Sequence, residues 1–481
     1  MELPTYMPAV RGHGRVDSAT AGSRSAGVII AALIWGVVGP AVAVCLLVGA
    51  TRLAVIVTAA GIIAHSMLRP DVSVYFLAAA IPLEAPLTFA QGFTGPKVIG
   101  VGAMIVLLPR LVRAAQGWFQ GRGDPMAKWP VLMILLGLLL LPIAPYKAVG
   151  LTMVIRFVLV CSMPLLICVV ADTRGKLTVL LTMLILGSFV MSLLQILAPG
   201  TTEAVARETA RSRVEVSAVE GLRDDLGWLT RLAMIAVFSC AYLAITLRGG
   251  GRRLLYLLPV PILIGAIVIA KSRSVWVSGP AALLGAILFT RRMGSKRKAL
   301  VIVLVLVGAV GSAFAVGAMG LFGEGVTERF MSIFEGAEAS SFRDVLYVSF
   351  LRLSVERVGL GYGVSQARYA PGHAVFGTPS HNDVLEVLAD LGVLGLIFFV
   401  GMHVGVLRRW RKIALPWDRF FVLLLWMALF TASMFRTAVY DKHYWLVLGV
   451  ILALIRINEN EQRLQIQYGG TLSPFEPNTP R

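Results

Sequence analysis

The sequence predicts an all-α polytopic integral membrane protein with about 12–14 transmembrane helices. Of its 481 residues, 57% are hydrophobic and only 15% are charged, whereas a soluble domain carries roughly 25% charged residues. The apolar residues also gather into runs of about 20, the length that a helix needs to cross a bilayer. Residues 322–387 interrupt these runs as one long loop.

A window of about 20 residues places the expected spans in order along the chain. They are residues 27–49, 52–68, 72–91, 97–115, 129–145, 150–171, 176–198, 226–247, 254–270, 275–290, 299–321, 388–407, 420–436 and 443–457. The residues before the first run lack a cleavable signal pattern, so we expect that first span to be retained.

The spans divide the chain into five expected parts. We predict a cytoplasmic N-terminal tail over residues 1–26, transmembrane helices 1–11 over 27–321, and a large periplasmic loop over 322–387. The C-terminal transmembrane helices follow over 388–457, and a cytoplasmic tail covers 458–481.

The charge of the chain supports this orientation. Lys and Arg outnumber Asp and Glu by 44 to 26, for a net charge of +18. In a soluble protein this excess would indicate nucleic acid. Here it sits in short connections such as "RGGGRR", "RRMGSKRK" and "RRWRK", which the positive-inside rule assigns to the cytoplasm. We therefore expect membrane lipids as partners, and no nucleic acid.

Neither disulfides nor a metal site are expected. The four cysteines all lie inside apolar runs, without a CxxC pair. His373 and His381 share the long loop without the short spacing of a helical ligand pair, and the outer loops contain no D-x-D. The sequence thus predicts metal-independent chemistry without a cofactor, in which arginines neutralise negative charge.

The long loop contains a predicted amphipathic helix. Phe342, Val345, Leu346, Ser349 and Leu353 recur at helical spacing, which favours a helix lying on the bilayer surface. The glycines of "GLGYG" then end it.

Two arginines are candidates for binding an anion. Arg273, in "AKSRSVW", stands at the expected outer membrane boundary against the usual charge bias; the alternative is a snorkelling anchor. Arg343 opens the loop helix near the head-group plane, where its planar fork suits phosphate. For Arg343 the alternative is a solvated ion pair.

His381 is the candidate general base. It lies in "TPSHNDVLEVLADLGVLG", where a polar segment enters an apolar helix. Histidine has an unperturbed pKa of about 6.5 and suits proton transfer near neutral pH. In the structural alternative, His381 is only part of a helix start that Asn382 or Asp383 caps.

Three ordered motifs resemble the O-antigen ligase and polymerase superfamily. They are "AKSRSVWVSGPAALLGAILF", "SFRDVLYVSFLRLSVERVGLGYGVSQARY" and "SHNDVLEVLADLGVLGLIFF", which lie between Ala270 and Val400. The resemblance implies a GT-C-like glycosyltransferase of the bacterial inner membrane, with its active site facing the periplasm. Such enzymes transfer a glycan from undecaprenyl diphosphate to lipid A-core in the ligases, or to a lipid-linked glycan in the polymerases.

The resemblance also implies roles for individual residues. Arg273 and Arg343 match the arginines that bind the donor diphosphate, and His381 matches the catalytic histidine. Arg223 is a further donor-binding candidate, although "RVEVSAVEGLRDDLGWLTRLA" lacks the family's asparagine. Direct displacement by an activated hydroxyl would invert the anomeric configuration.

Other interpretations remain open. Ligase and polymerase share every motif above. The alternative class is a membrane transporter of a small anion or lipid-linked glycan, which would place ionisable residues within spans; Glu84 and Arg156 are the main candidates. A scaffold subunit of an assembly complex would tolerate loss of His381.

Overall fold

The computed structural model describes the greater part of the chain. The described residues are 57–58, 60–62, 64–65, 69–84, 88–90, 93–119, 126–197, 225–247, 250–270, 272–290, 343–371, 373 and 377–467. The predicted spans 27–49 and 299–321, most of 52–68, and the predicted loop up to Phe342 lie outside them. The chain divides into two compact units, Met1–Ser73 and Val74–Arg481, and the site lies in the second.

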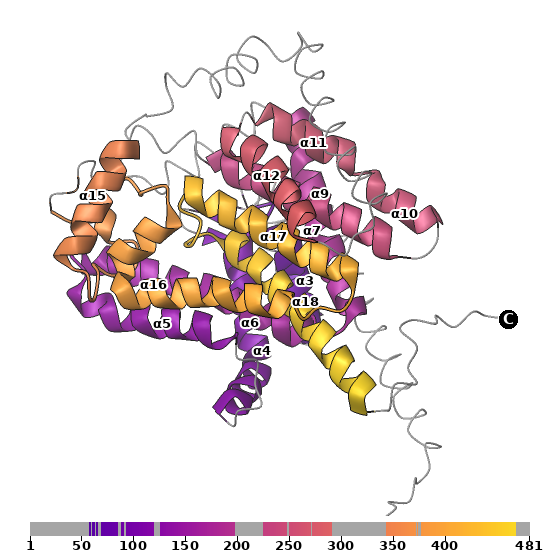
Figure 1. Ribbon diagram of the computed structural model, residues 1–481, viewed down its shortest axis with the longest axis horizontal. Coiled ribbons are helices and arrows are strands. Elements are labelled where there is room, and N and C mark those ends of the chain that lie inside the picture. The colour runs from indigo at the N-terminus through magenta and orange to yellow at the C-terminus, as the bar shows by residue number, and fades with distance from the viewer. Residues whose placement is uncertain are drawn as a thin grey trace, which may run out of the picture. The chain divides into compact units, whose positions relative to one another are not determined.

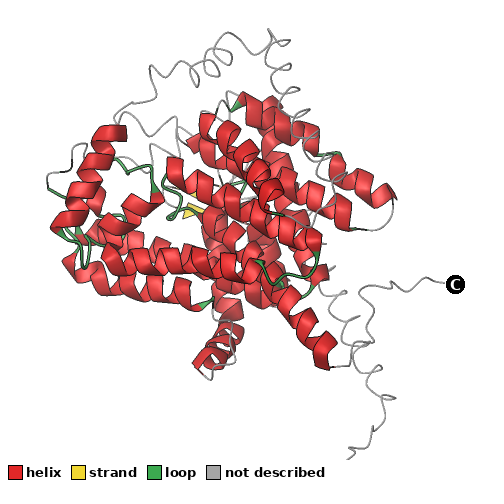
Figure 2. Cartoon of the chain, in the orientation of Figure 1, coloured by secondary structure: helices red, strands yellow, loops and turns green. Residues whose placement is uncertain are grey.

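The described chain is almost entirely helical, as the sequence predicts (Figure 2). A two-stranded antiparallel hairpin, β1 (Thr88–Ala90) and β2 (Phe93–Thr94), is the exception among the described residues. Seven of the described spans are long and apolar enough to cross a membrane. The fold class, an all-α polytopic membrane protein, is confirmed, and the total of 12–14 helices stays a prediction.

The helices between residues 70 and 197 follow most of the predicted spans. They are α3 (Pro70–Ala80), α4 (Gly95–Phe119), α5 (Lys128–Leu140) with the 3₁₀ turn η1 (Leu141–Ile143), α6 (Lys147–Val170) and α7 (Arg174–Leu197). The predicted span 72–91 is wrong in extent, because α3 ends at Ala80 and a turn follows. Pro82 in that turn lacks a backbone N–H and cannot continue the helix.

In the next part of the chain, two of the four helices are each shorter than a membrane span. They are α9 (Asp225–Thr246), α10 (Gly250–Leu257), α11 (Val260–Ile269) and α12 (Arg273–Phe289). The predicted span 254–270 contains two helices, because Pro259 separates α10 from α11; together, Gly250–Ile269 is still long and apolar enough to cross a membrane.

The C-terminal part carries the elements of the candidate site (Figure 1). They are α15 (Arg343–Glu356), η3 (Ala367–Tyr369), α16 (Asp383–Trp410), α17 (Pro416–Phe435) and α18 (Lys442–Gln467). α16 bends at Gly392, whose φ of 67° favours glycine. A Cβ there would also lie 2.5 Å from the carbonyl oxygen of Gly359, so the segment after α15 packs directly on this bend.

α15 forms where the sequence predicts it, but it is apolar on two sides. Leu346, Phe350 and Leu353 are buried toward α16. Val348 and Val355 are 69% and 71% exposed on the other side. The prediction of one apolar face is therefore wrong, and Val345, which was expected to share the face of Leu346, belongs to the exposed side at 42% exposure.

Aromatic and small side chains pack the remaining helices together. Phe157 of α6 meets Trp445 of α18 edge-on at 6.3 Å between ring centroids. Tyr242 of α9 stacks on Phe421 of α17 at 4.2 Å. α12 packs against α17 and α9, with Gly285 close to the Met427 side chain. These contacts bring α9, α12 and α17 side by side.

Candidate functional site

His381 occupies a tight turn directly before α16. Its φ is +56°, a left-handed conformation that is uncommon for residues other than glycine. The next residue, Asn382, is the helix N-cap: its Oδ1 accepts from the N–H groups of Val384 at 2.9 Å and Leu385 at 3.2 Å. Of the two capping candidates, the structure selects Asn382.

Asp383 has a different role, which it shares with two acids that the sequence analysis missed. Asp383, Glu386 and Asp390 are each 0% exposed. Their spacing of three and four residues places them on one face of the first two turns of α16. The pattern D-x-x-E-x-x-x-D was readable in the sequence, but the predicted span began only at Leu388.

Glu386 ties the His381 turn to two other segments. Its Oε2 accepts from the backbone N–H of Ser380 at 2.7 Å and from Thr437 Oγ1 at 3.3 Å. Its Oε1 accepts from Arg368 Nη2 at 2.8 Å. Burial lowers the pKa of the Arg368 guanidinium, but Glu386 together with Tyr369, Asp390 and Tyr440 outweighs burial and raises this pKa above its ordinary value. Arg368 and Glu386 form an ion pair.

Asp383 and Asp390 connect the same face of α16 by hydrogen bonds to the neighbouring chain segments. Asp390 accepts from the N–H groups of Ser365 and Ala367, at 3.0 and 2.7 Å, and from Tyr440 Oη at 2.6 Å. Asp383 Oδ1 accepts from the N–H groups of residues 438 and 439 at 2.6 and 2.8 Å. All three acids thus bind the connection between α17 and α18 at residues 436–441.

Arg343 is the first residue of α15 and belongs to the same packed pair of helices as His381. Phe350 and Leu353 of α15 form a core with Ala389 of α16, against which Leu385 packs. Beyond the C-terminal end of α15, Tyr362 N–H donates to Ala389 O at 3.0 Å. Arg343, which is partly buried, therefore lies at the end of α15 opposite to this contact.

Arg273 is the first residue of α12, which is not packed on α15 or α16 in the described structure. α12 lies against α17 and α9, where Gly279 approaches Met234 and Gly285 approaches Met427. Arg223, the fourth site candidate, lies outside the described residues. The structure thus brings Arg343 and the His381 turn to one helix pair, and within the described residues α12, which begins at Arg273, is linked to that pair through α17.

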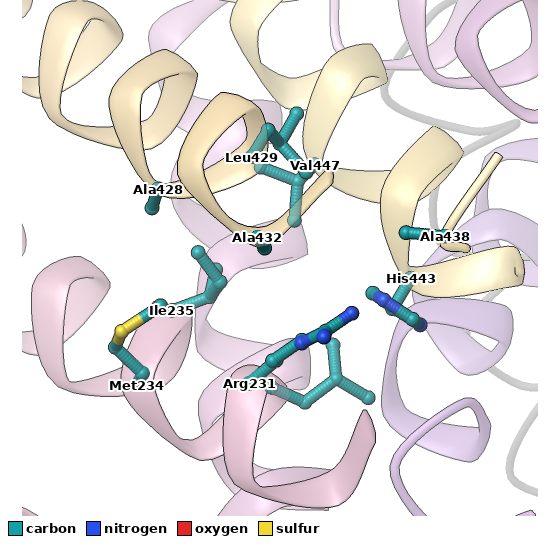
Figure 3. A pocket seen from close by; sticks show the side chains of 10 residues that line it. Arg231, Met234, Ile235, Ala428, Leu429, Ala432, Ala438, His443 and Val447 are labelled. Atoms are coloured by element: carbon teal, nitrogen blue, oxygen red, sulfur yellow. The ribbon is translucent and has the colours of Figure 1, made fainter. Parts of the chain in front are cut away.

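A cationic cluster adjoins that connection. Arg231 of α9 is 3% exposed and lines a cavity of about 10 Å³ with His443, room for about one water molecule. Figure 3 shows the two side chains pointing toward each other. Arg156 binds Asp441 at 3.3 Å. Burial raises the pKa of Asp441, but the nearby basic side chains of His443, Arg436, Arg156 and Arg231 together outweigh burial and lower this pKa below its ordinary value.

The two residues that the transporter alternative named are both in ion pairs. Arg156 pairs with Asp441, as above. Glu84 pairs with Lys442 and accepts from Thr94 Oγ1 at 3.1 Å. Glu84 stands in the turn after α3, so the expectation that it lies within a span is wrong.

Within the described ranges, no group of three or more His, Cys, Asp or Glu side chains is placed to hold a metal ion. The acids of α16 instead bind amides, hydroxyls and Arg368.

Comparison with known proteins identifies the domain that carries these residues. Residues 258–400 match the family model described as O-antigen ligase, and this stretch contains Arg273, Arg343 and His381. No curated protein matches the chain. The match supports a membrane glycosyltransferase-like role in O-antigen or polysaccharide assembly. Over these residues, which make up less than half of the chain, the sequence is similar to the O-antigen ligase family.

Proposed function

We propose that the protein is a metal-independent, inverting glycosyltransferase whose active site faces the periplasm of the bacterial inner membrane. It transfers a glycan from undecaprenyl diphosphate to a sugar hydroxyl of an acceptor, either lipid A-core or a lipid-linked glycan. The observation that carries this proposal is His381, held in a left-handed turn before α16 within the O-antigen ligase domain. A left-handed backbone is uncommon for a residue other than glycine, and such residues cluster at functional sites.

His381 acts on the acceptor. Its imidazole takes the proton of the acceptor hydroxyl while the hydroxyl oxygen attacks the anomeric carbon. The bond between that carbon and the lipid diphosphate breaks, and the diphosphate leaves with the electron pair. General base catalysis of this kind contributes about 10²- to 10⁴-fold to the rate.

Arg273 and Arg343 act on the donor, and Arg223 is proposed as a third donor contact. Arg273 and Arg343 each stand at the first residue of a helix. Guanidinium groups bind phosphate oxygens through paired hydrogen bonds, and backbone N–H groups at a helix start favour an anion in the same place. Such groups stabilise the charge that develops on the departing diphosphate.

The buried acids of α16 support the proposal of inversion. A retaining enzyme needs a carboxylate as nucleophile. Asp383, Glu386 and Asp390 are each 0% exposed and accept hydrogen bonds from the surrounding chain. Buried and engaged in this way, they support direct displacement by the acceptor.

The test is glycan transfer by the purified protein from a defined undecaprenyl-diphosphate glycan, with lipid A-core and a lipid-linked glycan as separate acceptors. We expect one acceptor to be used, and activity to survive EDTA. His381→Ala and His381→Gln should both abolish most transfer, because glutamine keeps polarity but is no base near neutral pH. His373→Ala, in the same loop, is the control and should remain active. Near-normal transfer by His381→Gln would refute the base role, and loss to EDTA with rescue by Mg²⁺ would refute metal independence.

A further inference from the structure

The backbone at His381 needs support from its neighbours. Among the described non-glycine residues, only His381 and Ser365 have a positive φ, each at +56°. Such a conformation is costly for a residue with a side chain, and it persists where the surrounding structure imposes it. The source of that support is therefore part of how the site works.

The residues on both sides of His381 are fixed. Ser380, 0% exposed, donates its backbone N–H to Glu386 Oε2 at 2.7 Å. Its Oγ donates to Asn382 O at 2.8 Å and accepts from Asn382 N–H at 3.2 Å. Asn382 in turn caps α16. The turn is thus closed on itself, and it is held to α16 by the Asn382 cap on one side of His381 and by the Glu386 side chain on the other.

Glu386 is itself held from two directions. Arg368, in the segment after α15, donates to Oε1 at 2.8 Å, and Thr437, in the connection after α17, donates to Oε2 at 3.3 Å. Three donors thus converge on two carboxylate oxygens. An amide in this position would offer only one acceptor oxygen and would present an N–H₂ group to donors.

We propose that Glu386 is the positioning residue of the site: it fixes the direction of His381 by holding the Ser380 backbone. This inference rests on the proposed role of His381 as base. In this role Glu386 does not contact the substrate. Glu386 acts on His381 through the backbone of the turn. The same carboxylate accepts hydrogen bonds from Arg368 and Thr437 and so fixes the position of the turn relative to both residues.

The experiment compares two buried acids on one face of α16. Glu386→Gln should lower kcat by about 100-fold, the cost of misplacing a reacting group by about 1 Å, and should leave the affinity for the donor lipid nearly unchanged. Asp390→Asn is the matched control. Asp390 is equally buried, but it accepts from the N–H groups of Ser365 and Ala367 and not from that of Ser380. The Asp390→Asn protein should therefore retain most of the transfer rate.

Amide hydrogen exchange on the full-length protein in detergent gives a second readout that needs no activity. Glu386→Gln should speed exchange at Ser380 and leave Ala367 unchanged, whereas Asp390→Asn should do the reverse. Glu386→Asp keeps the charge but shortens the side chain by one methylene, so it should also speed exchange at Ser380. This variant provides the test if the Glu386→Gln protein does not fold.

The outcomes separate the two proposals. Transfer that survives in His381→Ala would overturn the base role, and exchange at Ser380 would still report whether Glu386 holds the turn. Unchanged exchange at Ser380 in both Glu386 variants would overturn the positioning role, even with His381 essential. A Glu386→Gln protein that loses donor affinity as much as kcat would also overturn it, because it would place Glu386 at the donor.

Discussion

At the scale of single residues, the proposed roles predict different kinetic failures. Arg273→Ala and Arg343→Ala should weaken donor binding together with turnover, because truncating a buried charged hydrogen bond costs about 2–5 kcal/mol. His381→Ala should bind donor nearly normally and lose kcat. Donor affinity measured by titration, beside steady-state transfer rates, separates the two classes.

Lysine variants sharpen the same prediction. Arg273→Lys and Arg343→Lys keep the charge but lose the bidentate fork, so each should restore only part of the activity. Full activity with lysine at both positions would reduce the arginines to general cations near the head groups. Arg352→Lys is the control, since Arg352 is 72% exposed and pairs with Glu356 four residues on.

The residues of the site were predictable only in part. The motifs single out Arg273, Arg343 and His381 as candidates, because ionisable side chains stand out in an apolar chain, and the family resemblance implies their roles. They do not identify Glu386, since a carboxylate at the start of a helix ordinarily signals a solvated first turn. Its burial depends on Arg368 and Thr437, which approach from distant parts of the sequence.

At the scale of elements, long apolar helices were predicted well and their interruptions were not. α6, α7 and α9 match their expected spans closely, because hydropathy alone defines a helix surrounded by lipid. The ends of α3 and α10 depend on single prolines within apolar sequence. The second apolar side of α15 was missed because periodicity cannot show which face a neighbouring helix covers.

That second side of α15 carries a prediction. Val348 and Val355 are exposed on the face turned away from α16, and we expect this face to lie against the bilayer. Tryptophan at Val348 should be quenched by brominated lipid in reconstituted vesicles. Lys412→Trp, in the exposed connection after α16, is the water-facing reference. Equal quenching of the two tryptophans would contradict this placement of α15.

At the scale of the whole molecule, Asp418 joins four helices. The first turn of α17 places it 2.8 Å from Arg174 Nη1, Tyr242 Oη and Asn458 Nδ2, which belong to α7, α9 and α18. Asp418→Ala would leave the buried Tyr242 hydroxyl without its acceptor, which costs about 1–3 kcal/mol, while Arg174 keeps its ion pair with Glu461. We expect a clearly lower midpoint of thermal unfolding in detergent.

The control for Asp418 is an exposed ion pair at the start of α7. Asp172 and Lys176 lie 3.0 Å apart with side chains 43% and 36% exposed, and such surface pairs contribute about 0–1 kcal/mol. Asp172→Ala should therefore unfold nearly as the parent does. Equal destabilisation by both variants would argue against a specific role for the Asp418 cluster in joining the bundle.

The orientation of the bundle decides whether the site can meet a lipid-linked glycan at the periplasmic face. Three glycines permit a direct test, because a Cβ at Gly175, Gly251 or Gly359 meets nothing within 4 Å. The parent should carry Cys45→Ser, since Cys45 lies outside the described residues, while the described cysteines are buried.

In cells with a permeabilised outer membrane, Gly359→Cys should react with an impermeant maleimide. Gly175→Cys and Gly251→Cys should react only after the inner membrane is disrupted, because basic connections are retained in the cytoplasm. The reverse pattern would place α15 and the His381 turn on the cytoplasmic side, away from the face where we propose that transfer takes place. It would overturn the proposed active-site location while leaving the helical fold intact.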